Sequence, residues 1–94
     1  MPDLPSVELL ESTHAFPCDY MFKVIGESDA LLAARVMDAI RQEISEEHEP
    51  ALNVRRTAGG RHMCVTIEPR VADANQVLAI YRRIYALDGL VMVW

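Results

Sequence analysis

Residues 19–26 read DYMFKVIG. Tyr20, Phe22 and Val24 occupy alternate positions, and Gly26 ends the run. This period of two is typical of a β-strand with one apolar face. We therefore expect a strand over this range, with these three side chains turned toward the core.

The chain that follows alternates between helical and extended patterns. A helix is expected after Ser28 or Asp29, either of which can cap it, with Pro50 as its limit; its apolar positions lie four apart, at Leu32, Val36, Ile40 and Ile44. Strands are predicted at 51–57 and 61–68, on either side of the turn sequence Ala58-Gly59-Gly60.

A second helix and a last strand complete the chain. Asp73 is expected to cap the helix, and Gly89 can take the left-handed conformation that ends it; the apolar face comprises Val77, Ile80, Ile84 and Leu87. Residues 90–94 then form a strand. The order β-α-β-β-α-β predicts an α+β, ferredoxin-like domain. Its antiparallel sheet has the strand order 4-1-3-2, and both helices cover one face.

The domain is expected to span 18–94, preceded by a largely irregular arm at 1–17 with about one helical turn. A hairpin centred on Ala58-Gly59 places Val54 opposite Met63 and Leu52 opposite Val65, and Phe22 is placed opposite Val65. All of these side chains then belong to the core.

The opposite face is left open and mixed in character: Met21, Lys23, Ile25, Asn53, Arg55, His62, Cys64, Thr66, Val91 and Val93. Such a face suits pairing with a second copy, so we expect a homodimer through the open sheet face.

The charges are unevenly distributed along the 94 residues, whose net charge is −5. Residues 1–49 hold 11 acidic and 3 basic residues, whereas 50–94 hold 3 acidic and 6 basic. This balance excludes a generally basic nucleic-acid binder.

No apolar run approaches the ~20 residues that a membrane helix needs, and the N-terminal residues lack the pattern of a signal peptide. A cytoplasmic location is expected.

Metal binding and catalysis find little support. The candidate metal ligands are His14, Cys18, His62 and Cys64. Cys18 and Cys64 are expected roughly 16 Å apart along the sheet, too far to share an ion or form a disulfide. The loop at 26–29 is acidic and holds no anion-binding arginine. RNA-binding sheets of this topology stack bases on open-face aromatics, and none is expected here. We predict no enzyme activity, no metal and no cofactor.

Basic residues near the hairpin give the strongest functional signal. Arg55, Arg56 and Arg61 flank the turn, and Gly26 and Ser28 are expected at the same end of the domain, together with the later turns of the second helix, which carry Arg82 and Arg83. The acidic residues at 43–49 are expected at the opposite end. The alternative is an ordinary solvated surface, in which arginine stems pack on apolar neighbours.

The stretch FPCDYMFKVIG at 16–26 resembles the opening strand of the YbeD-like family of small bacterial proteins of unknown function. The glycine-rich hairpin, the second helix and the ending GLVMVW at 89–94 fit the same pattern, so the resemblance covers about residues 8–94. It implies a ferredoxin-like fold similar to ACT regulatory domains, which bind small effectors and pair through their sheets. It implies no catalytic residues.

These observations predict a non-enzymatic regulatory or protein-interaction module. Arg55, Arg56, Arg61, Gly26 and Ser28 are its candidate residues for binding an anionic effector or the surface of a partner protein. The alternative from another class is an RNA-contacting ferredoxin-like domain.

Overall fold

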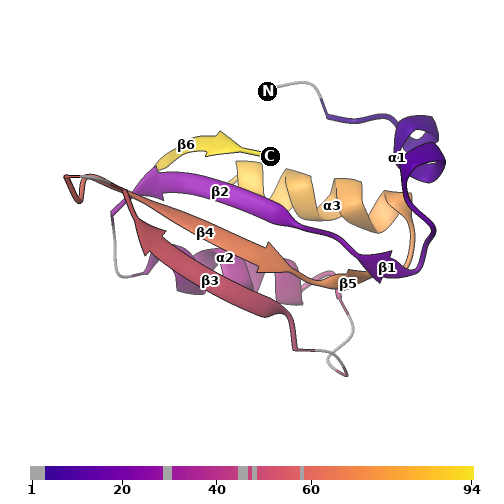
Figure 1. Cartoon of the computed structure of the whole chain (residues 1–94), viewed down its shortest axis with the longest axis horizontal. Coiled ribbons are helices and arrows are strands. Elements are labelled where there is room, and N and C mark those ends of the chain that lie inside the picture. The colour runs from indigo at the N-terminus through magenta and orange to yellow at the C-terminus, as the bar shows by residue number, and fades with distance from the viewer. Residues whose placement is uncertain (1–3, 29–30, 45–46, 48, 58) are drawn as a thin grey trace.

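The computed structural model describes residues 4–28, 31–44, 47, 49–57 and 59–94. Its main sheet has the order β3-β4-β2-β6, and α2 and α3 lie behind this sheet in Figure 1. The elements in chain order are α1 (Val7–Thr13), β1 (Cys18–Asp19), β2 (Phe22–Glu27), α2 (Leu32–Arg41), β3 (Ala51–Arg56), β4 (His62–Glu68), β5 (Arg70–Val71), α3 (Ala74–Tyr85) and β6 (Leu90–Val93). The predicted α+β class and the strand order 4-1-3-2 are confirmed.

The two long helices begin in different ways. Asp73 caps α3 as predicted, because its carboxylate accepts a 2.8 Å hydrogen bond from the backbone nitrogen of Gln76. Leu31 occupies the cap position of α2 and makes no side-chain hydrogen bond there. The prediction that Ser28 caps this helix is therefore wrong, and Asp29 lies outside the described residues.

The segment before the sheet is more ordered than predicted. Its helix α1 starts where the Ser6 hydroxyl accepts a 3.1 Å hydrogen bond from the nitrogen of Leu9. Leu10 of α1 is only 2% exposed and belongs to the hydrophobic core. The short strands β1 and β5 pair antiparallel beyond the end of the main sheet, so the strand expected at 19–26 is split in two.

The strand register differs from the prediction by two residues. Val24 pairs with Val65, and Val54 also pairs with Val65 on the other side of β4. The hairpin turns on Gly59 and Gly60, whose φ angles of 88° and 71° suit glycine; Ala58, on which the prediction was centred, is outside the described residues. A shift of two keeps each side chain on its predicted face.

The core lies between the sheet and the helices, and its buried side chains come from every layer: Leu10, Phe22, Val24, Leu32, Val36, Ile40, Met63, Val65, Ile67, Val71, Ala74, Val77, Leu78, Ile80, Tyr81 and Ile84. Leu52 and Val54 were expected among them. Both are exposed, at 45% and 43%, because β3 is an edge strand whose six residues are all exposed. Their assignment to the core was therefore wrong.

The other edge strand, β6, contains an irregularity. Val93 pairs with Val24, but Gly26 pairs with Leu90, so the register shifts by one residue near Val91. Val93 consequently packs against the core, and its predicted place on the open face was wrong. Trp94 exchanges two backbone hydrogen bonds with Lys23, at 2.7 and 2.9 Å.

No helix in the described part of the chain combines the length and the apolar character needed to cross a bilayer.

Candidate functional site

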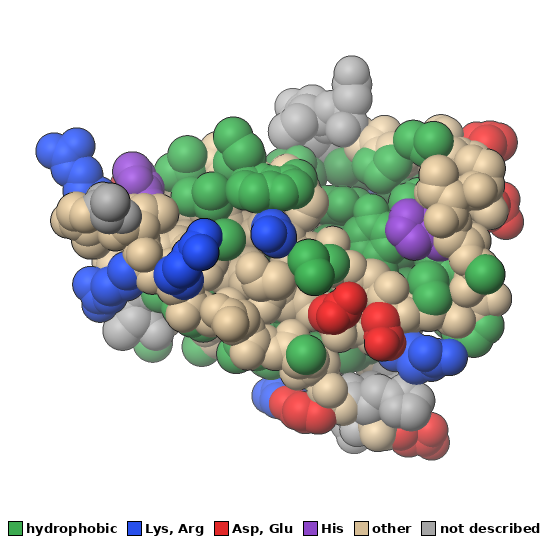
Figure 2. Space-filling view, viewed as in Figure 1, with side chains coloured by type: hydrophobic (Ala, Val, Ile, Leu, Met, Phe, Trp, Pro, Cys, Tyr) green, Lys and Arg blue, Asp and Glu red, His purple; other side chains and the backbone are tan. Residues whose placement is uncertain are grey.

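The open face of the main sheet is turned away from α2 and α3 and faces the viewer in Figures 1 and 2. Hydrophobic side chains gather over β6 in Figure 2, and Lys and Arg side chains lie beside them and toward the hairpin. Because Trp94 stands opposite Lys23, its side chain projects from this same face. The face thus combines apolar and cationic surface.

A hollow of about 300 Å³ occupies the middle of this face. Its lining side chains come from the three adjacent strands β2, β3 and β4: Lys23, Asn53, Arg55, Cys64 and Thr66. Thr66 pairs with Lys23 on one side and Asn53 on the other, and Arg55 stands two pairs farther along, opposite Cys64. The hollow therefore offers an ammonium, a guanidinium, an amide and a hydroxyl, which can all donate hydrogen bonds to an anion.

The cationic side chains of this chain differ in whether they have a carboxylate partner. Arg41, Arg70 and Arg83 form ion pairs with Glu49, Asp19 and Glu43, respectively. In contrast, the side chains that we call the basic end make no ion pair or hydrogen bond with any described residue: Lys23, Arg55, Arg56 and Arg61. Acidic side chains of the open face stand at its ends, where Glu27 pairs with His62 and Glu68 pairs with Ala51.

The structure brings the predicted site residues to one end of the domain but not to one face. Arg55 projects onto the open face and Arg56 onto the helix-covered face, because successive residues of a strand alternate. Ser28 joins the two loops at this end: its backbone nitrogen donates a 2.9 Å hydrogen bond to the carbonyl of Arg61. The Ser28 hydroxyl is buried and makes no hydrogen bond to a described residue.

Gly26 has a packing role at its position in β2. A Cβ atom there would lie 2.8 Å from Cδ2 of Leu32 and 2.9 Å from the carbonyl oxygen of Gly89. Since Gly26 pairs with the buried Met63, it faces the core rather than the hollow. Its glycine allows α2 and β6 to approach the strand closely.

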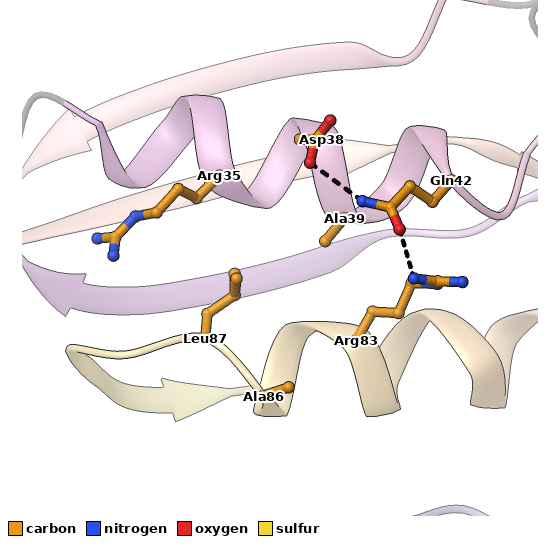
Figure 3. Close-up of a pocket in the computed structure, with 7 residues that line it drawn as sticks. All are labelled: Arg35, Asp38, Ala39, Gln42, Arg83, Ala86 and Leu87. Carbon is orange, nitrogen blue, oxygen red and sulfur yellow. Dashed lines mark hydrogen bonds between the residues drawn. The ribbon is translucent and has the colours of Figure 1, made fainter.

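Arg83 lies away from the basic end, contrary to the expectation for the later turns of the second helix. Its guanidinium pairs with Glu43 and donates to Gln42, whose amide in turn donates a 3.0 Å hydrogen bond to Asp38. Asp38, Gln42 and Arg83 line a groove of about 200 Å³ between α2 and α3, where Figure 3 shows the bonded chain from Asp38 to Arg83. Three polar side chains of this groove, Asp38, Gln42 and Arg83, are thus engaged with one another.

Trp94, Asn53 and Thr66 were not predicted as site residues. Lys23 was placed on the open face but was not assigned a role. Trp94 could not be placed, because the irregularity at Val91 changes which residues of β6 face the solvent. Placing Asn53 and Thr66 beside Lys23 requires the register of the strands. The alternation of apolar residues does not distinguish between registers that differ by two residues.

In the part of the chain that the structure describes, the side chain with a clearly shifted pKa is a tyrosine, Tyr81. The hydroxyls of Tyr20 and Tyr81 lie 3.0 Å apart, one donating to the other. Burial, followed by this hydrogen bond, raises the pKa of Tyr81 well above its ordinary value. Among the described residues, no three His, Cys, Asp or Glu side chains are placed to hold a metal ion, and Cys18 and Cys64 are free thiols.

Comparison with known proteins identifies similar chains in several bacteria. The model of a family described as "Protein of unknown function (DUF493)" matches residues 11–94. A UPF0250 protein from Paraburkholderia phytofirmans is 32% identical over 83 residues, covering 88% of this chain and 90% of that protein. A UPF0250 protein from Shewanella amazonensis is 30% identical over 75 residues, covering 80% and 83%. The solution structure of protein HP0495 from H. pylori shares the fold, with a TM-score of 0.69 at 13% identity, over 100% of this chain and 98% of that one.

Proposed function

The chain belongs to the DUF493 family of proteins of unknown function, and we propose that it is a non-catalytic interaction module whose basic end binds an acidic segment of a partner protein. One observation carries this proposal. The four cations Lys23, Arg55, Arg56 and Arg61 lack a carboxylate partner among the described residues, although the chain has a net charge of −5. A partner's carboxylates supply what the chain itself does not.

The hollow gives this contact a specific place. A carboxylate seated between Lys23 and Arg55 receives charge-assisted hydrogen bonds, which are roughly twice as strong as neutral ones. Asn53 and Thr66 supply further donors within the same hollow. The exposed Trp94 and Met92 beside it offer apolar surface to neighbouring side chains of the partner. A regulatory role of the module would follow from which partner it binds.

A titration with a defined probe tests the proposal. The probe is a fluorescein-labelled peptide of twelve residues that is rich in Asp and Glu, and binding is followed by fluorescence anisotropy at low and high salt. We expect binding that weakens as salt rises, because exposed ionic contacts are screened. Replacing Arg55, Arg56 and Arg61 with Ala should weaken it at least about tenfold, as expected for the loss of several charged contacts.

The matched control removes the same number of charges elsewhere. Arg41, Arg70 and Arg83 already have carboxylate partners, so replacing these three with Ala should leave the probe's affinity within about twofold. Equal losses in the two triple variants would mean that only overall charge matters and would overturn the proposal. Absence of binding at low salt would overturn it as well.

A second candidate, binding of single-stranded RNA, rests on Trp94. This side chain is 47% exposed and projects from the open face beside Lys23, where an aromatic ring can stack on a base. The central strands β2 and β4, both described in full, carry no Phe, Tyr or Trp on the open face, where RNA-binding sheets place their stacking rings, and this favours the acidic partner instead. Binding of a uridine-rich oligonucleotide that Trp94→Ala abolishes, with no binding of the acidic peptide, would select this candidate.

Pairing of two copies through the open face stays a prediction. Light scattering over a range of protein concentrations tests it, because a dimer doubles the mass. A dimer that Lys23→Glu separates would support pairing through this face, whereas a monomer at every concentration would rule it out.

A further inference from the structure

We infer that the acidic partner segment binds as an additional β-strand along the outer edge of β3, antiparallel to it. Five consecutive residues of this segment then follow the pattern acidic, acidic, apolar, any residue, apolar. The inference rests on the proposed function for the acidic character of the partner. It adds the mode of binding and the sequence pattern of the segment.

The outer edge of β3 lacks a partner among the described strands over six residues and combines apolar with cationic side chains. All six residues of this strand are exposed, and on the helix side it presents Leu52 and Val54, which are 45% and 43% exposed. Proteins usually protect such edges with lysines, prolines, bulges or short strands. The other edge strand, β6, is short and irregular near Val91. In contrast, β3 contains neither lysine nor proline and pairs with β4 without a register shift.

The hydrogen-bond pattern of the hairpin identifies the backbone groups that face outward. The nitrogen of Thr57 donates to the carbonyl of His62 at 2.9 Å, so Thr57 belongs to a hydrogen-bonded pair. Such pairs alternate along an antiparallel ladder. The N–H and C=O groups of Leu52, Val54 and Arg56 therefore point away from β4 toward the open edge, where an added strand can bond to them.

The side chains of β3 then define the partner's sequence. In an antiparallel strand, the first two positions stand opposite Arg56 and Arg55, and acidic residues there complement both charges on the two faces. The third and fifth positions stand opposite Val54 and Leu52, where apolar side chains cover the exposed surface. The fourth position, opposite Asn53, is less restricted.

A second copy of this chain fits the edge less well. If two β3 strands paired antiparallel with Leu52 opposite the partner's Val54, Arg55 would stand opposite the partner's Ala51 and Arg56 opposite the partner's Pro50. Both arginines would then lack a facing carboxylate. In the register that sets Leu52 opposite the partner's Leu52, Arg55 would face the partner's Glu49, a residue that already pairs with Arg41. Charge complementarity thus favours an acidic segment as the occupant.

Backbone methylation of a probe tests the inference directly. The probe is a labelled peptide containing Glu-Asp-Val-Thr-Val, titrated by fluorescence anisotropy. Methylating the backbone nitrogen of the first valine blocks a bond to Val54 and should weaken binding at least tenfold. Methylating the nitrogen of the threonine, which points away from β3, should change the affinity less than twofold. The two peptides have the same charge and composition.

A matched pair of protein variants provides the second measurement. Val54→Pro removes an outward N–H but no bond to β4, and proline is tolerated at such edge positions. Val54→Ala keeps this N–H. We expect Val54→Pro to weaken binding at least tenfold beyond Val54→Ala, with the two circular dichroism spectra superimposable.

The possible failures are distinguishable. If the two methylated peptides bind equally and the loss still depends on Arg55, Arg56 and Arg61, strand addition is wrong and the proposed function stands. If no acidic peptide binds at low salt, both are wrong. A dimer in light scattering that Val54→Pro alone separates would overturn the acidic segment as the occupant of this edge.

Discussion

Leu52 of β3 and Ile67 of β4 stand directly opposite each other on the helix-covered side of the sheet, yet Ile67 is fully buried whereas Leu52 is 45% exposed. The boundary of the core therefore runs between two neighbouring strands. It separates residues that hold the fold together from residues that are free to contact a partner.

This boundary predicts unequal effects of truncating the two side chains. Ile67→Ala should lower the free energy of unfolding by about 2–5 kcal/mol, because it leaves a cavity in the packed core. Leu52→Ala should lower it by less than about 1 kcal/mol, since water already reaches this side chain. Urea denaturation followed by circular dichroism measures both. Equal losses would show that the helices cover β3 as well.

The N-terminal helix offers a similar pair. Leu10 is 2% exposed and its neighbour Leu9 is 53% exposed. Leu10→Ala should cost about 2–5 kcal/mol of stability, whereas Leu9→Ala should be nearly neutral. The same denaturation experiment compares them. A neutral Leu10→Ala would mean that α1 is an appendage rather than a part of the core.

The close approach at Gly26 predicts a steric effect. In Gly26→Ala, the new methyl group would meet Leu32 and the backbone of Gly89, and such overpacking typically costs about 1–3 kcal/mol. Gly26→Ala combined with Leu32→Ala removes one of the two obstacles, so the combined loss should be smaller than the sum of the two single losses. Strict additivity of the losses would contradict this explanation.

The buried Tyr81 predicts a loss of stability at alkaline pH. Its pKa is raised in the folded state, so above pH ~10 the unfolded chain loses this proton first. The folded state then binds more protons than the unfolded state, and stability falls as pH rises, by up to about 1.4 kcal/mol per pH unit. Tyr20 and Tyr85 face the same hydroxyl and contribute to the shift.

Tyr81→Phe is the control for this titration. It removes the ionisable group and should make the decline in stability above pH ~10 less steep. Thermal melts from pH 8 to pH 11 measure the slopes. Identical slopes in the two proteins would show that Tyr81 ionises equally readily in the folded and unfolded states.

The topology could be predicted from the sequence because alternation and capping act locally. Asp73 starts the second helix, and Phe22 and Val24 identify the buried face of their strand, without knowledge of the partner strands. The expectation that Gly89 ends this helix was wrong, because α3 ends at Tyr85 and Gly89, with a φ angle of 80°, lies in the turn before β6.

The register could not be predicted, because a shift of two residues preserves every face. Choosing between such registers requires the geometry of the hairpin turn, which Gly59 and Gly60 set by their positive φ angles.

The candidate site was predicted less completely, for physical reasons that differ between residues. Arg55, Arg56 and Arg61 were recognised because charge clusters are visible in the sequence. Whether a given arginine already has a carboxylate partner, as Arg83 has in Glu43, depends on how the helices pack. The exposure of Leu52 and Val54 was missed because alternation shows which side a residue faces, not whether a helix reaches it.

The position of Trp94 gives the protein a built-in optical reporter. It is the single tryptophan of the chain, and its backbone bonds to Lys23 hold it beside the hollow rather than in the core. Its intrinsic emission should therefore change in intensity or wavelength when the open face is covered, without any attached dye. Occupancy of that face can thus be followed in the unmodified chain.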